Sequence, residues 1–347
     1  MNLNDKIYVA GHNGLAGSAI VKNLKSKGYL NLLVKTRSEL NLLNQTDVAN
    51  FFKHEKPDYV ILAAANVGGI VANNKYRASF IYENLQIQNN VIHQSFLSEV
   101  KKLLFLGSTC VYPKEVLQPI KEDYLLTSEL EYTNEPYAIA KIAGIKMCES
   151  YNIQYGTNYI SVMPTNLYGP NDKYDLEKSH VLPALLKKFH LAKLLSDGKN
   201  DEVLNILGFS SFDKSQEYLK SVGIFKDKVE VWGTGNPRRE FLYSDDMADA
   251  CVFLLENIDF KDCVKANQKE IRNTHINVGT GNDISIAELA KLIKKIVGYK
   301  GDIFFNSKKP DGTIFKLTNT DKMNAFGWSH KMNLKNGIQK IYNDYVK

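Results

Sequence analysis

The first half of the chain alternates short apolar runs with amphipathic stretches. The apolar runs predict buried strands at 6–11, 31–36, 58–65, 101–108 and 159–170. Apolar positions at helical spacing predict helices between these strands, at 17–28, 48–57, 77–100 and 136–156. Continuous apolar strands that alternate with helices are typical of a parallel sheet covered on both faces. The pattern therefore predicts an α/β fold with a doubly wound parallel sheet.

The alternation becomes irregular after Pro170. Helices are expected at 179–195, 241–258 and 285–298, and strands at 229–235 and 275–281. The polar segment at about 196–228 has no repeat and is interpreted as an insertion. We therefore expect two domains. The first is a Rossmann domain, formed by 1–168 plus about 240–280. The second is a smaller α/β domain that binds substrate, formed by 169–239 plus 281–347.

Composition narrows the class of protein. The 347 residues are 44% apolar, and the net charge of +6 is scattered along the chain, so a small anionic ligand is favoured over nucleic acid. The four cysteines show no metal-ligand spacing, which predicts reduced thiols and no metal site. The N-terminus does not resemble a signal peptide, and no apolar run reaches the roughly 18 residues of a membrane span. A cytoplasmic protein without membrane contact is expected.

Three glycines lie where the first predicted strand turns into the first helix. They are Gly11, Gly14 and Gly17 in "AGHNGLAGSAI". Glycine permits a tight turn and lets backbone N–H groups approach a pyrophosphate at a helix N-terminus. The motif predicts a dinucleotide cofactor. After the second strand, Lys35 and Arg37 stand where an NAD-binding protein would carry a carboxylate, which favours the 2′-phosphate of NADP.

A second motif carries acid–base chemistry. Tyr137 and Lys141 are four residues apart, and therefore on one face of a helix. A neighbouring ammonium is expected to move the phenol pKa from about 10 toward the working range. Ser108 follows the strand at 101–108 and can hold a carbonyl oxygen while Tyr137 protonates it. Together with the glycine turn, these residues predict hydride transfer from a nicotinamide to a ketone.

The combination resembles the extended short-chain dehydrogenase/reductase family, and more narrowly its GDP-L-fucose synthases. The stretches that carry the resemblance are "AGHNGLAGSAI", "LAAANVGGIVANN", "KLLFLGSTCVYP", "TNEPYAIAKIAGIKMCESYN", "SVMPTNLYGPND", "SHVLPALL", "REFLYSDDMA", "HINVGTG" and "KPDGT". Enzymes of this family epimerise carbons 3 and 5 of GDP-4-keto-6-deoxymannose and then reduce the ketone with NADPH. The resemblance therefore implies a GDP-4-keto-6-deoxy sugar as substrate and NADPH as cofactor.

The resemblance also implies roles for individual residues. Cys110 and His180 match the acid and base of the epimerisation. The matching cofactor contacts, besides the three glycines, are Asn13, Leu15, Arg37, Asn41, Leu42, Ala63, Ala64, Leu106, Gly107, Lys141, Pro164, Asn166, Leu167 and His180. The matching substrate contacts are Ser108, Asn166, Lys188, Trp232, Arg239 and Asp311. A homodimer through the helices at 77–100 and 136–156, with Ile81, Ile87 and Ile145 outward, is also implied.

The sequence departs from the family in four places. Asn13 replaces a common arginine, which leaves Arg37 for the 2′-phosphate, and Lys188 replaces another arginine, giving a point charge in place of a fork. Ile314 and Phe315 stand where a proline and a basic residue are usual. The insertion at about 196–228 follows the predicted Lys188 contact. A different or larger sugar is therefore an open alternative.

Other functions stay open at this point. Relatives that reduce 4-keto-6-deoxyheptoses for bacterial polysaccharides need not epimerise. A sugar-nucleotide 4-epimerase would turn over without added NADPH. A 4,6-dehydratase would carry an acidic pair after Thr109, where this chain has Cys110 and Val111. A non-catalytic NADP-binding regulator would not need the trio of Ser108, Tyr137 and Lys141.

Overall fold

The computed structural model describes residues 1–176, 179–265, 269–309 and 311–347, so Pro310 of the "KPDGT" motif lies outside the description. The described chain forms two compact units. The first unit comprises Met1–Asn171, Glu240–Asn282 and Leu317–Met332, and the second comprises Asp172–Arg239, Asp283–Lys316 and Asn333–Lys347. Leu317–Met332, which the sequence analysis places in the second domain, belongs to the first unit because its helix α11 (Asp321–Ala325) packs against strand β9 (Ile276–Val278).

A parallel six-stranded sheet forms the centre of the first unit and confirms the predicted doubly wound fold. Its order is β2-β1-β3-β4-β5-β9. Besides β9, its strands are β1 (Ile7–Ala10), β2 (Leu32–Leu33), β3 (Tyr59–Leu62), β4 (Lys102–Leu106) and β5 (Tyr159–Pro164). All five pairings are parallel, with Ile7 opposite both Leu32 and Tyr59. The chain runs from β1 to one side and then returns to the other, which creates a switch point between β1 and β3 where ligands of such sheets bind.

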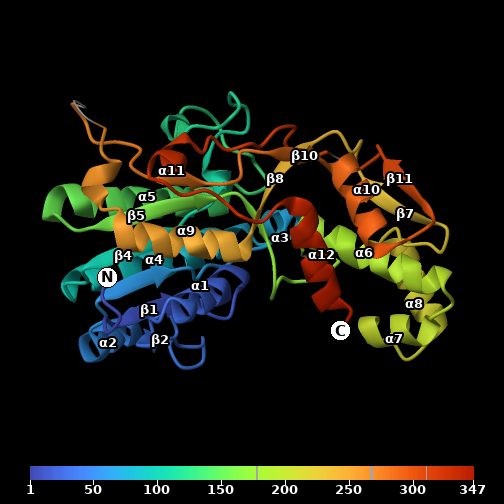
Figure 1. Cartoon of the computed structure of the whole chain (residues 1–347), viewed down its shortest axis with the longest axis horizontal. Coiled ribbons are helices and arrows are strands. Elements are labelled where there is room, and N and C mark those ends of the chain that lie inside the picture. Colours follow the sequence, from blue (N-terminus) through green and yellow to red (C-terminus); the bar gives the residue numbers. More distant parts are fainter. Residues whose placement is uncertain (177–178, 266–268, 310) are drawn as a thin grey trace. The chain divides into compact units, whose positions relative to one another are not determined.

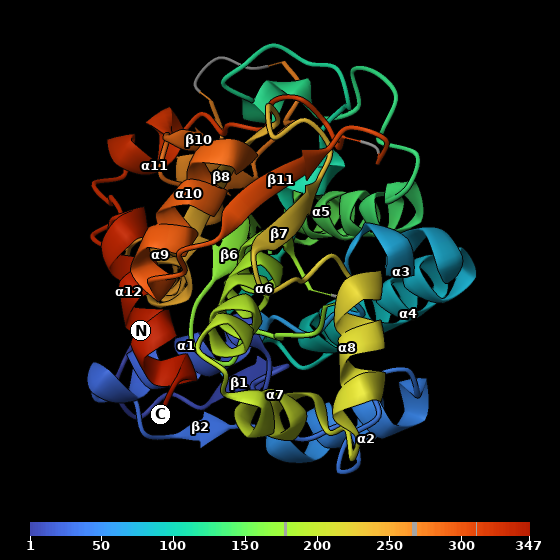
Figure 2. The same ribbon diagram turned by 90° about the vertical axis from the view of Figure 1, so that its right-hand side faces the viewer.

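Helices cover both faces of this sheet (Figures 1 and 2). On one face α1 (Leu15–Ser26) packs beside α9 (Ser244–Asn257), and α11 joins the same apolar core. On the other face lie α2 (Gln45–Glu55), α4 (Arg77–Leu97) and α5 (Glu135–Tyr155), with the short α3 (Ile70–Lys75) leading into α4. Every residue of β1, β4 and β5 is buried, as expected for strands covered on both sides.

Two predicted elements have different bounds. The strand expected at 159–170 divides into β5 and β6 (Asn166–Tyr168), and β6 pairs with β8 (Arg238–Tyr243) outside the main sheet. The helix expected at 241–258 begins at Ser244, because 241–243 complete β8. A short, fully apolar run such as 241–243 gives no periodicity that separates a buried strand from a buried helix.

The second unit is built around two parallel strands, β7 (Lys228–Trp232) and β11 (Asp302–Asn306), and the short β10 (Asp283–Ser285). Its long helices α6 (Val181–Ser196), α10 (Ile286–Val297) and α12 (Leu334–Tyr345) pack on one another in sequence-distant pairs. The segment interpreted as an insertion forms α7 (Asn200–Leu207) and α8 (Phe212–Ser221). It then joins β7, because Glu230 N donates to Gly223 O at 2.7 Å and Ile224 bridges Val229.

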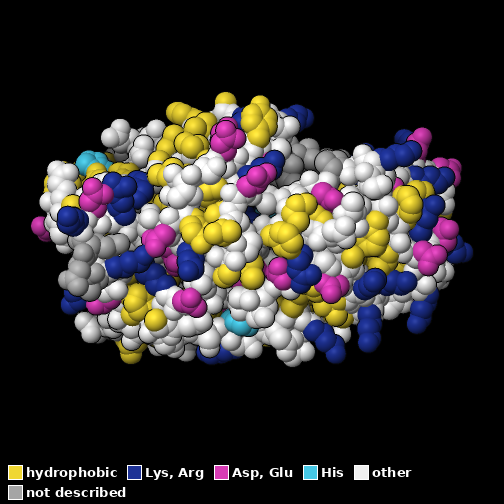
Figure 3. Space-filling view, turned by 90° about the horizontal axis from the view of Figure 1, so that it is seen from above, with side chains coloured by type: hydrophobic (Ala, Val, Ile, Leu, Met, Phe, Trp, Pro, Cys, Tyr) yellow, Lys and Arg dark blue, Asp and Glu magenta, His cyan; other side chains and the backbone are white. Residues whose placement is uncertain are grey.

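The outer surface is mixed. On the face shown in Figure 3, acidic and basic side chains are interspersed with apolar ones. Within the described ranges, no helix combines the length and the apolarity needed to cross a bilayer.

Glu240 fastens three segments of the first unit. Its side chain is fully buried and accepts hydrogen bonds from the backbone N–H groups of Thr280 (2.5 Å), Gly281 (2.7 Å) and Thr318 (2.9 Å), and from Thr318 Oγ1 (2.6 Å). A Cβ at Gly279 would lie 2.3 Å from Glu240 Oε1, so the neighbouring turn requires glycine. The carboxylate therefore ties the start of β8 to residues 280–281 and 318.

Replacing Glu240 with alanine leaves the N–H groups of Thr280, Gly281 and Thr318 without this acceptor, and of these residues Thr318 is buried. We expect Glu240→Ala to lower the free energy of unfolding by about 1–3 kcal/mol, the cost of one unsatisfied buried donor. Urea unfolding followed by circular dichroism measures this. The exposed Glu217 on α8 gives the matched control, because Glu217→Ala should leave the midpoint unchanged. Equal midpoints for the two variants would contradict the role given to Glu240.

Candidate active site

The glycine turn closes against the switch point of the sheet. Gly11, directly after β1, has a φ of +87°, and a Cβ there would lie 2.7 Å from the backbone N of Ala64. A Cβ at Gly17 would lie 2.1 Å from Gly11 O, which no relaxation of a side chain could relieve. Gly14 N donates to Gly11 O at 3.1 Å and completes the turn. The first and third glycines are therefore required by backbone contact.

The turn leaves the start of α1 open for an anion. Gly14 is the N-cap, and no side chain caps the helix. The first N–H groups of a helix have no partner within it, so they bind phosphate well. The predicted contacts Leu15, Ala63 and Ala64 lie at this point: Leu15 begins α1, and the two alanines follow β3. The residues present thus fit a dinucleotide pyrophosphate.

Arg37 lies on an exposed turn after β2, and Asn13 is exposed in the glycine turn. The turn is held by Glu39, whose carboxylate accepts from Thr36 N at 2.7 Å and Thr36 Oγ1 at 2.6 Å. These hydrogen bonds lower the pKa of Glu39, and the positive charge of Lys35 acts in the same direction. Sequence reasoning missed Glu39, because an acidic residue in a turn between a strand and a helix gives no signal of its partner.

The other predicted cofactor residues lie along the carboxyl edge of the sheet. Asn41 is exposed, and Leu42 O accepts from Asn90 on α4 at 2.8 Å. Pro164 ends β5, and Asn166 and Leu167 begin β6, where Asn166 donates to Glu240 O at 2.8 Å. Leu106 ends β4, and Gly107 follows it.

The loop after β4 holds Ser108 and Cys110 close together. Ser108 caps a 3-10 helix at Thr109–Val111, and its Oγ accepts from Cys110 N at 3.4 Å. Gly107 precedes them because a Cβ there would meet Met163 Cε at 2.2 Å. Ser108 is half-buried, whereas Cys110 is 8% exposed. Both side chains therefore project from a short turn fixed at its start by tight packing.

Helix α5 brings Tyr137 and Lys141 to the same strand end. It approaches β4 closely at Gly144, where a Cβ would lie 2.4 Å from Phe105 Cζ. One turn earlier, Lys141 donates to Leu106 O at 2.6 Å, and its Nζ lies 5.9 Å from the centre of the Tyr137 ring. Ser108, Cys110, Tyr137 and Lys141 are therefore grouped in the first unit, around the end of β4.

Burial sets the protonation of this group. It raises the pKa of Tyr137 well above its usual 10, and the charge of Cys110 acts in the same direction. It lowers the pKa of Lys141 to about 8, against an opposing effect of Cys110. The expectation that Lys141 brings Tyr137 toward its working range is therefore wrong, because desolvation raises the phenol pKa. Tyr137 stays protonated, which suits a proton donor.

His180 belongs to the second unit, where it is the N-cap residue of α6. Desolvation by surrounding protein lowers its pKa, and the positive charge of Lys316 adds to the effect. The imidazole is thus neutral over a wider pH range than a free histidine. A neutral imidazole can accept a proton.

Four predicted substrate residues also belong to the second unit. Lys188 on α6 is 9% exposed and donates to Glu230 O at 3.0 Å; burial lowers its pKa to about 8. The ammonium expected on a diphosphate is thus bonded to the backbone of β7. Trp232, at the end of β7, is 51% exposed, with Lys309 Nζ 5.1 Å from the ring centre.

Asp311 meets the turn that follows Trp232, and Arg239 bonds the segment that follows Asp311. Asp311 accepts from Thr234 N at 2.9 Å and from Thr234 Oγ1 at 2.7 Å, and it approaches Gly233 so closely that a Cβ there would clash. Arg239 donates to Thr313 O at 2.5 Å. Burial lowers the pKa of its guanidinium, opposed by Asp311. Hydrogen bonds therefore connect the turn after Trp232 to Asp311, and Arg239 to Thr313, two residues after Asp311.

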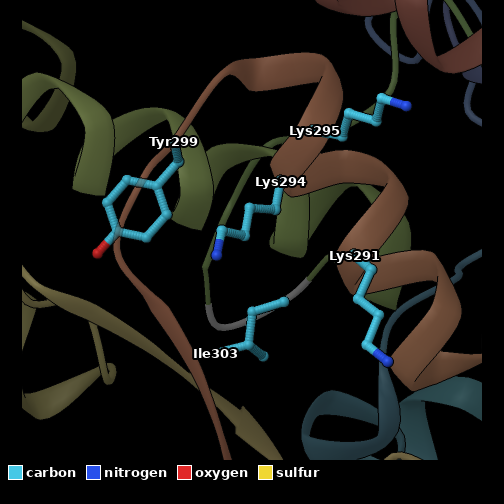
Figure 4. A pocket seen from close by; sticks show the side chains of 5 residues that line it. All are labelled: Lys291, Lys294, Lys295, Tyr299 and Ile303. Atoms are coloured by element: carbon cyan, nitrogen blue, oxygen red, sulfur yellow. The ribbon is translucent and has the colours of Figure 1, made fainter.

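A separate hollow of about 430 Å³ lies on the second unit between α10 and β11 (Figure 4). It is lined by Lys291, Lys294, Lys295, Tyr299 and Ile303, with Lys294 extending toward the space between Tyr299 and Ile303. None of the residues singled out in the sequence lines it.

The doubly wound sheet and its glycine cradle define a dinucleotide-binding protein. More narrowly, the chain belongs to the NAD dependent epimerase/dehydratase family, whose model it matches over residues 7–279. It is 50% identical over 342 residues to GDP-L-fucose synthase 1 of Arabidopsis thaliana, which covers 99% of this chain and 93% of that protein.

Solved structures from Campylobacter jejuni are similarly related. A GDP-6-OMe-4-keto-L-xylo-heptose reductase is 53% identical, with a TM-score of 0.96 over 100% of this chain and 99% of that one. A GDP-D-glycero-L-gluco-heptose synthase, solved in the presence of NADPH, is 52% identical, with a TM-score of 0.95 over 100% of both chains. These similarities span both units.

The glycine turn allows a matched pair of substitutions. Gly17→Ala places a methyl group 2.1 Å from a backbone oxygen, whereas Gly14→Ala places one at an ordinary 3.5 Å. We expect Gly17→Ala to weaken NADPH binding at least tenfold and to lower the thermal midpoint. Gly14→Ala should keep the midpoint of the parent chain. NADPH fluorescence titration and calorimetry measure the two effects. Equal thermal midpoints would show that the turn can open without cost.

The depressed pKa of Lys141 predicts a pH effect on stability. Its folded pKa of about 8 lies below the unfolded value of 10.5, so between these values the unfolded chain binds more protons. The free energy of unfolding then rises with pH across this window. Lys141→Met should remove that rise, worth about 3 kcal/mol at 1.36 kcal/mol per unit. Urea unfolding at pH 7 and pH 10.5 measures it, and parallel pH profiles for variant and parent would refute it.

Proposed function

We propose that this protein is an NADPH-dependent 4-reductase of a GDP-4-keto-6-deoxy sugar, which also epimerises carbons 3 and 5. The observation that carries the proposal is the group around the end of β4, where the Tyr137–Lys141 pair and the Ser108–Cys110 turn meet within one unit. The relatedness to GDP-L-fucose synthase over 99% of the chain supports the substrate class.

The reduction follows from the protonation states. NADPH, when bound, supplies the hydride. The Ser108 Oγ accepts from Cys110 N–H, so its own proton is available to hold the ketone oxygen. Tyr137, kept protonated by burial, donates its proton to that oxygen as negative charge develops. Lys141 is fixed on Leu106 O and places a positive charge beside the phenol as it gives up its proton.

Epimerisation needs a second pair of groups. A ketone at carbon 4 acidifies the hydrogens on carbons 3 and 5, and inversion requires a base on one face and an acid on the other. We assign these roles to Cys110 and His180. The electrostatic effect of Cys110 on both Tyr137 and Lys141 supports its membership of the site rather than of the core alone. The lowered pKa of His180 suits a group that takes up a proton.

The cofactor contacts are assigned to the glycine turn, the turn carrying Arg37 and the carboxyl edge of the sheet. The exposed Arg37 is the residue we assign to the 2′-phosphate of NADPH. Asn13 adds no charge there. On the second unit we assign the sugar nucleotide to Trp232, Arg239 and Asp311; Asp311 bonds the turn after Trp232, and Arg239 bonds Thr313 O. Lys188 uses one of its three N–H donors on Glu230 O, and it would join them through the other two.

A second candidate is a reductase of a GDP-4-keto-heptose that does not epimerise. The two Campylobacter jejuni structures favour it, because they are 52–53% identical and align with 100% of this chain, including the segment at 196–228. The two candidates share the reduction and differ in the sugar and in the use of Cys110.

We also propose a homodimer through α4 and α5. These adjacent helices expose large apolar side chains, which mark association surfaces when they gather. The exposed residues are Tyr82, Leu97, Ile139, Ile153 and Tyr155. Ile145, expected on the outer face, instead lies in the core and is 1% exposed, because α5 turns that side toward the sheet.

One experiment separates the functions. The protein is incubated in heavy water with NADPH and, separately, with GDP-4-keto-6-deoxymannose and a GDP-4-keto-heptose, and the products are analysed by mass spectrometry and NMR. We expect reduction of the deoxymannose substrate with solvent deuterium at carbons 3 and 5. Tyr137→Phe should slow reduction by about 10²–10⁴-fold. Cys110→Ser should suppress deuterium exchange while reduction continues. Cys148→Ser, at another buried thiol, should leave both exchange and reduction unchanged.

Each alternative has its own outcome. Reduction of the heptose alone, without exchange, supports the second candidate. Turnover without added NADPH would contradict a reductase. Unchanged exchange in Cys110→Ser would show that this thiol only packs, and reduction by Tyr137→Phe at the parent rate would remove the acid from the mechanism.

A further inference from the structure

A buried phenol fixes the far end of the loop that carries Ser108 and Cys110. Tyr112, two residues after Cys110, is 3% exposed. Its hydroxyl lies 2.5 Å from Asn277 Oδ1 and 3.1 Å from His275 Nε2. Both partners are fully buried and lie two positions apart, His275 directly before β9 and Asn277 within it. The loop after β4 is thus bonded through side chains to the strand at the edge of the sheet.

The hydrogens of this network have one consistent arrangement. Asn277 Nδ2 donates to Ile120 O at 2.9 Å, which turns the amide oxygen toward Tyr112. The phenol has a single proton, which it donates to that oxygen, so it must accept one from His275 Nε2. His275 is then the neutral tautomer with a bare Nδ1, and this atom is buried without a hydrogen-bond partner. Burial also lowers the pKa of His275 to about 3, which keeps the ring neutral.

The backbone around the two partners of Tyr112 is itself held by the side chains of Glu122 and Lys322. Asn277 N donates to Glu122 Oε1 at 3.0 Å. Lys322 donates to the carbonyl oxygens of Thr274 and His275, each at 3.0 Å. The histidine and the asparagine therefore cannot follow a movement of the loop, and the position of the phenol is set by the strand.

Only four residues separate the two fixed ends of the loop. At one end, Gly107 packs against Met163, and Leu106 O is bonded to Lys141. At the other end stands Tyr112. The intervening residues include both reactive side chains, Ser108 and Cys110. A displacement of about 1 Å at reacting groups can cost about 10²-fold in rate.

We propose that Tyr112, held by Asn277 and His275, is a positioning residue that sets the orientation of Ser108 and Cys110. The inference rests on the proposed function for its effect on catalysis. It adds to that function a second tyrosine, whose hydroxyl bonds Asn277 and His275 and acts through the loop.

The test removes one oxygen atom. Tyr112→Phe keeps the buried ring and deletes both hydrogen bonds. The control is Tyr159→Phe at the amino end of β5, where the phenol is 2% exposed and its hydroxyl is buried without a partner. With GDP-4-keto-6-deoxymannose, Tyr112→Phe should lower kcat about 10–100-fold, the scale of a loop misplacement. The KM for NADPH should change less than twofold, and Tyr159→Phe should match the parent.

A second pair of variants guards against simple misfolding. His275→Gln keeps an N–H donor for the phenol and should retain kcat within threefold of the parent. His275→Phe fills the same space without a donor and should lower kcat in the direction of Tyr112→Phe. A purely structural role would instead make both histidine variants lose activity in step with their thermal midpoints, which would overturn the proposal.

A readout without turnover separates this inference from the proposed function. Alkylation of Cys110 by iodoacetamide, quantified on its peptide by mass spectrometry, reports the loop directly. The rate should rise severalfold in Tyr112→Phe and stay unchanged in Tyr159→Phe. If the parent chain reduces none of the sugar nucleotides, the proposed function fails. The alkylation rates still test whether Tyr112 fixes the position of the loop. Parent-like alkylation in Tyr112→Phe, or altered alkylation with parent-like kcat, would refute the positioning role.

Discussion

The buried carboxylate of Glu240 is the interaction on which the arrangement of the first unit depends. After residue 171 the chain enters this unit again at residues 240 and 317 and leaves it at 282, and the side chain of residue 240 bonds backbone N–H groups near the other two places, at 280–281 and 318. A carboxylate without donors would be costly to bury, so the bonds and the burial require each other. Because Glu240 lies within β8, Asn166 on β6, which donates to Glu240 O, is positioned by the same residue.

Close backbone approach is the second constraint, and it shapes the site from two sides. Gly11 and Gly17 let the first helix start against the switch point of the sheet, and Gly144 lets α5 lie on β4 near Phe105. In each case the missing side chain allows a functional group to reach its place: the N–H groups of α1 in one, and the ammonium of Lys141 in the other. Glycine, which has no side chain, thus lets the functional groups reach their places.

The sequence predicted what depends on local pattern. The alternating runs gave the doubly wound sheet, and the glycine turn followed from three residues within one turn of chain. What could not be predicted depends on contacts between distant segments. Glu240 meets residues 280 and 318, Lys188 meets the backbone of β7, and Leu317–Met332 packs on the first unit. The prediction of a lowered pKa for Tyr137 is wrong for the same reason. Desolvation depends on everything that surrounds the phenol and not on its helical neighbour alone.

The two tryptophans of the chain lie one in each unit, in opposite surroundings. Trp328 in the first unit is 6% exposed and its indole N–H donates to Asp249 at 3.0 Å, whereas Trp232 in the second is half exposed beneath the Lys309 ammonium. Buried indoles emit at shorter wavelength than hydrated ones, and external quenchers such as iodide reach only the latter. Intrinsic fluorescence therefore resolves the two units optically without any label, with the blue-shifted, protected component reporting the nucleotide-fold unit and the quenchable component reporting the other.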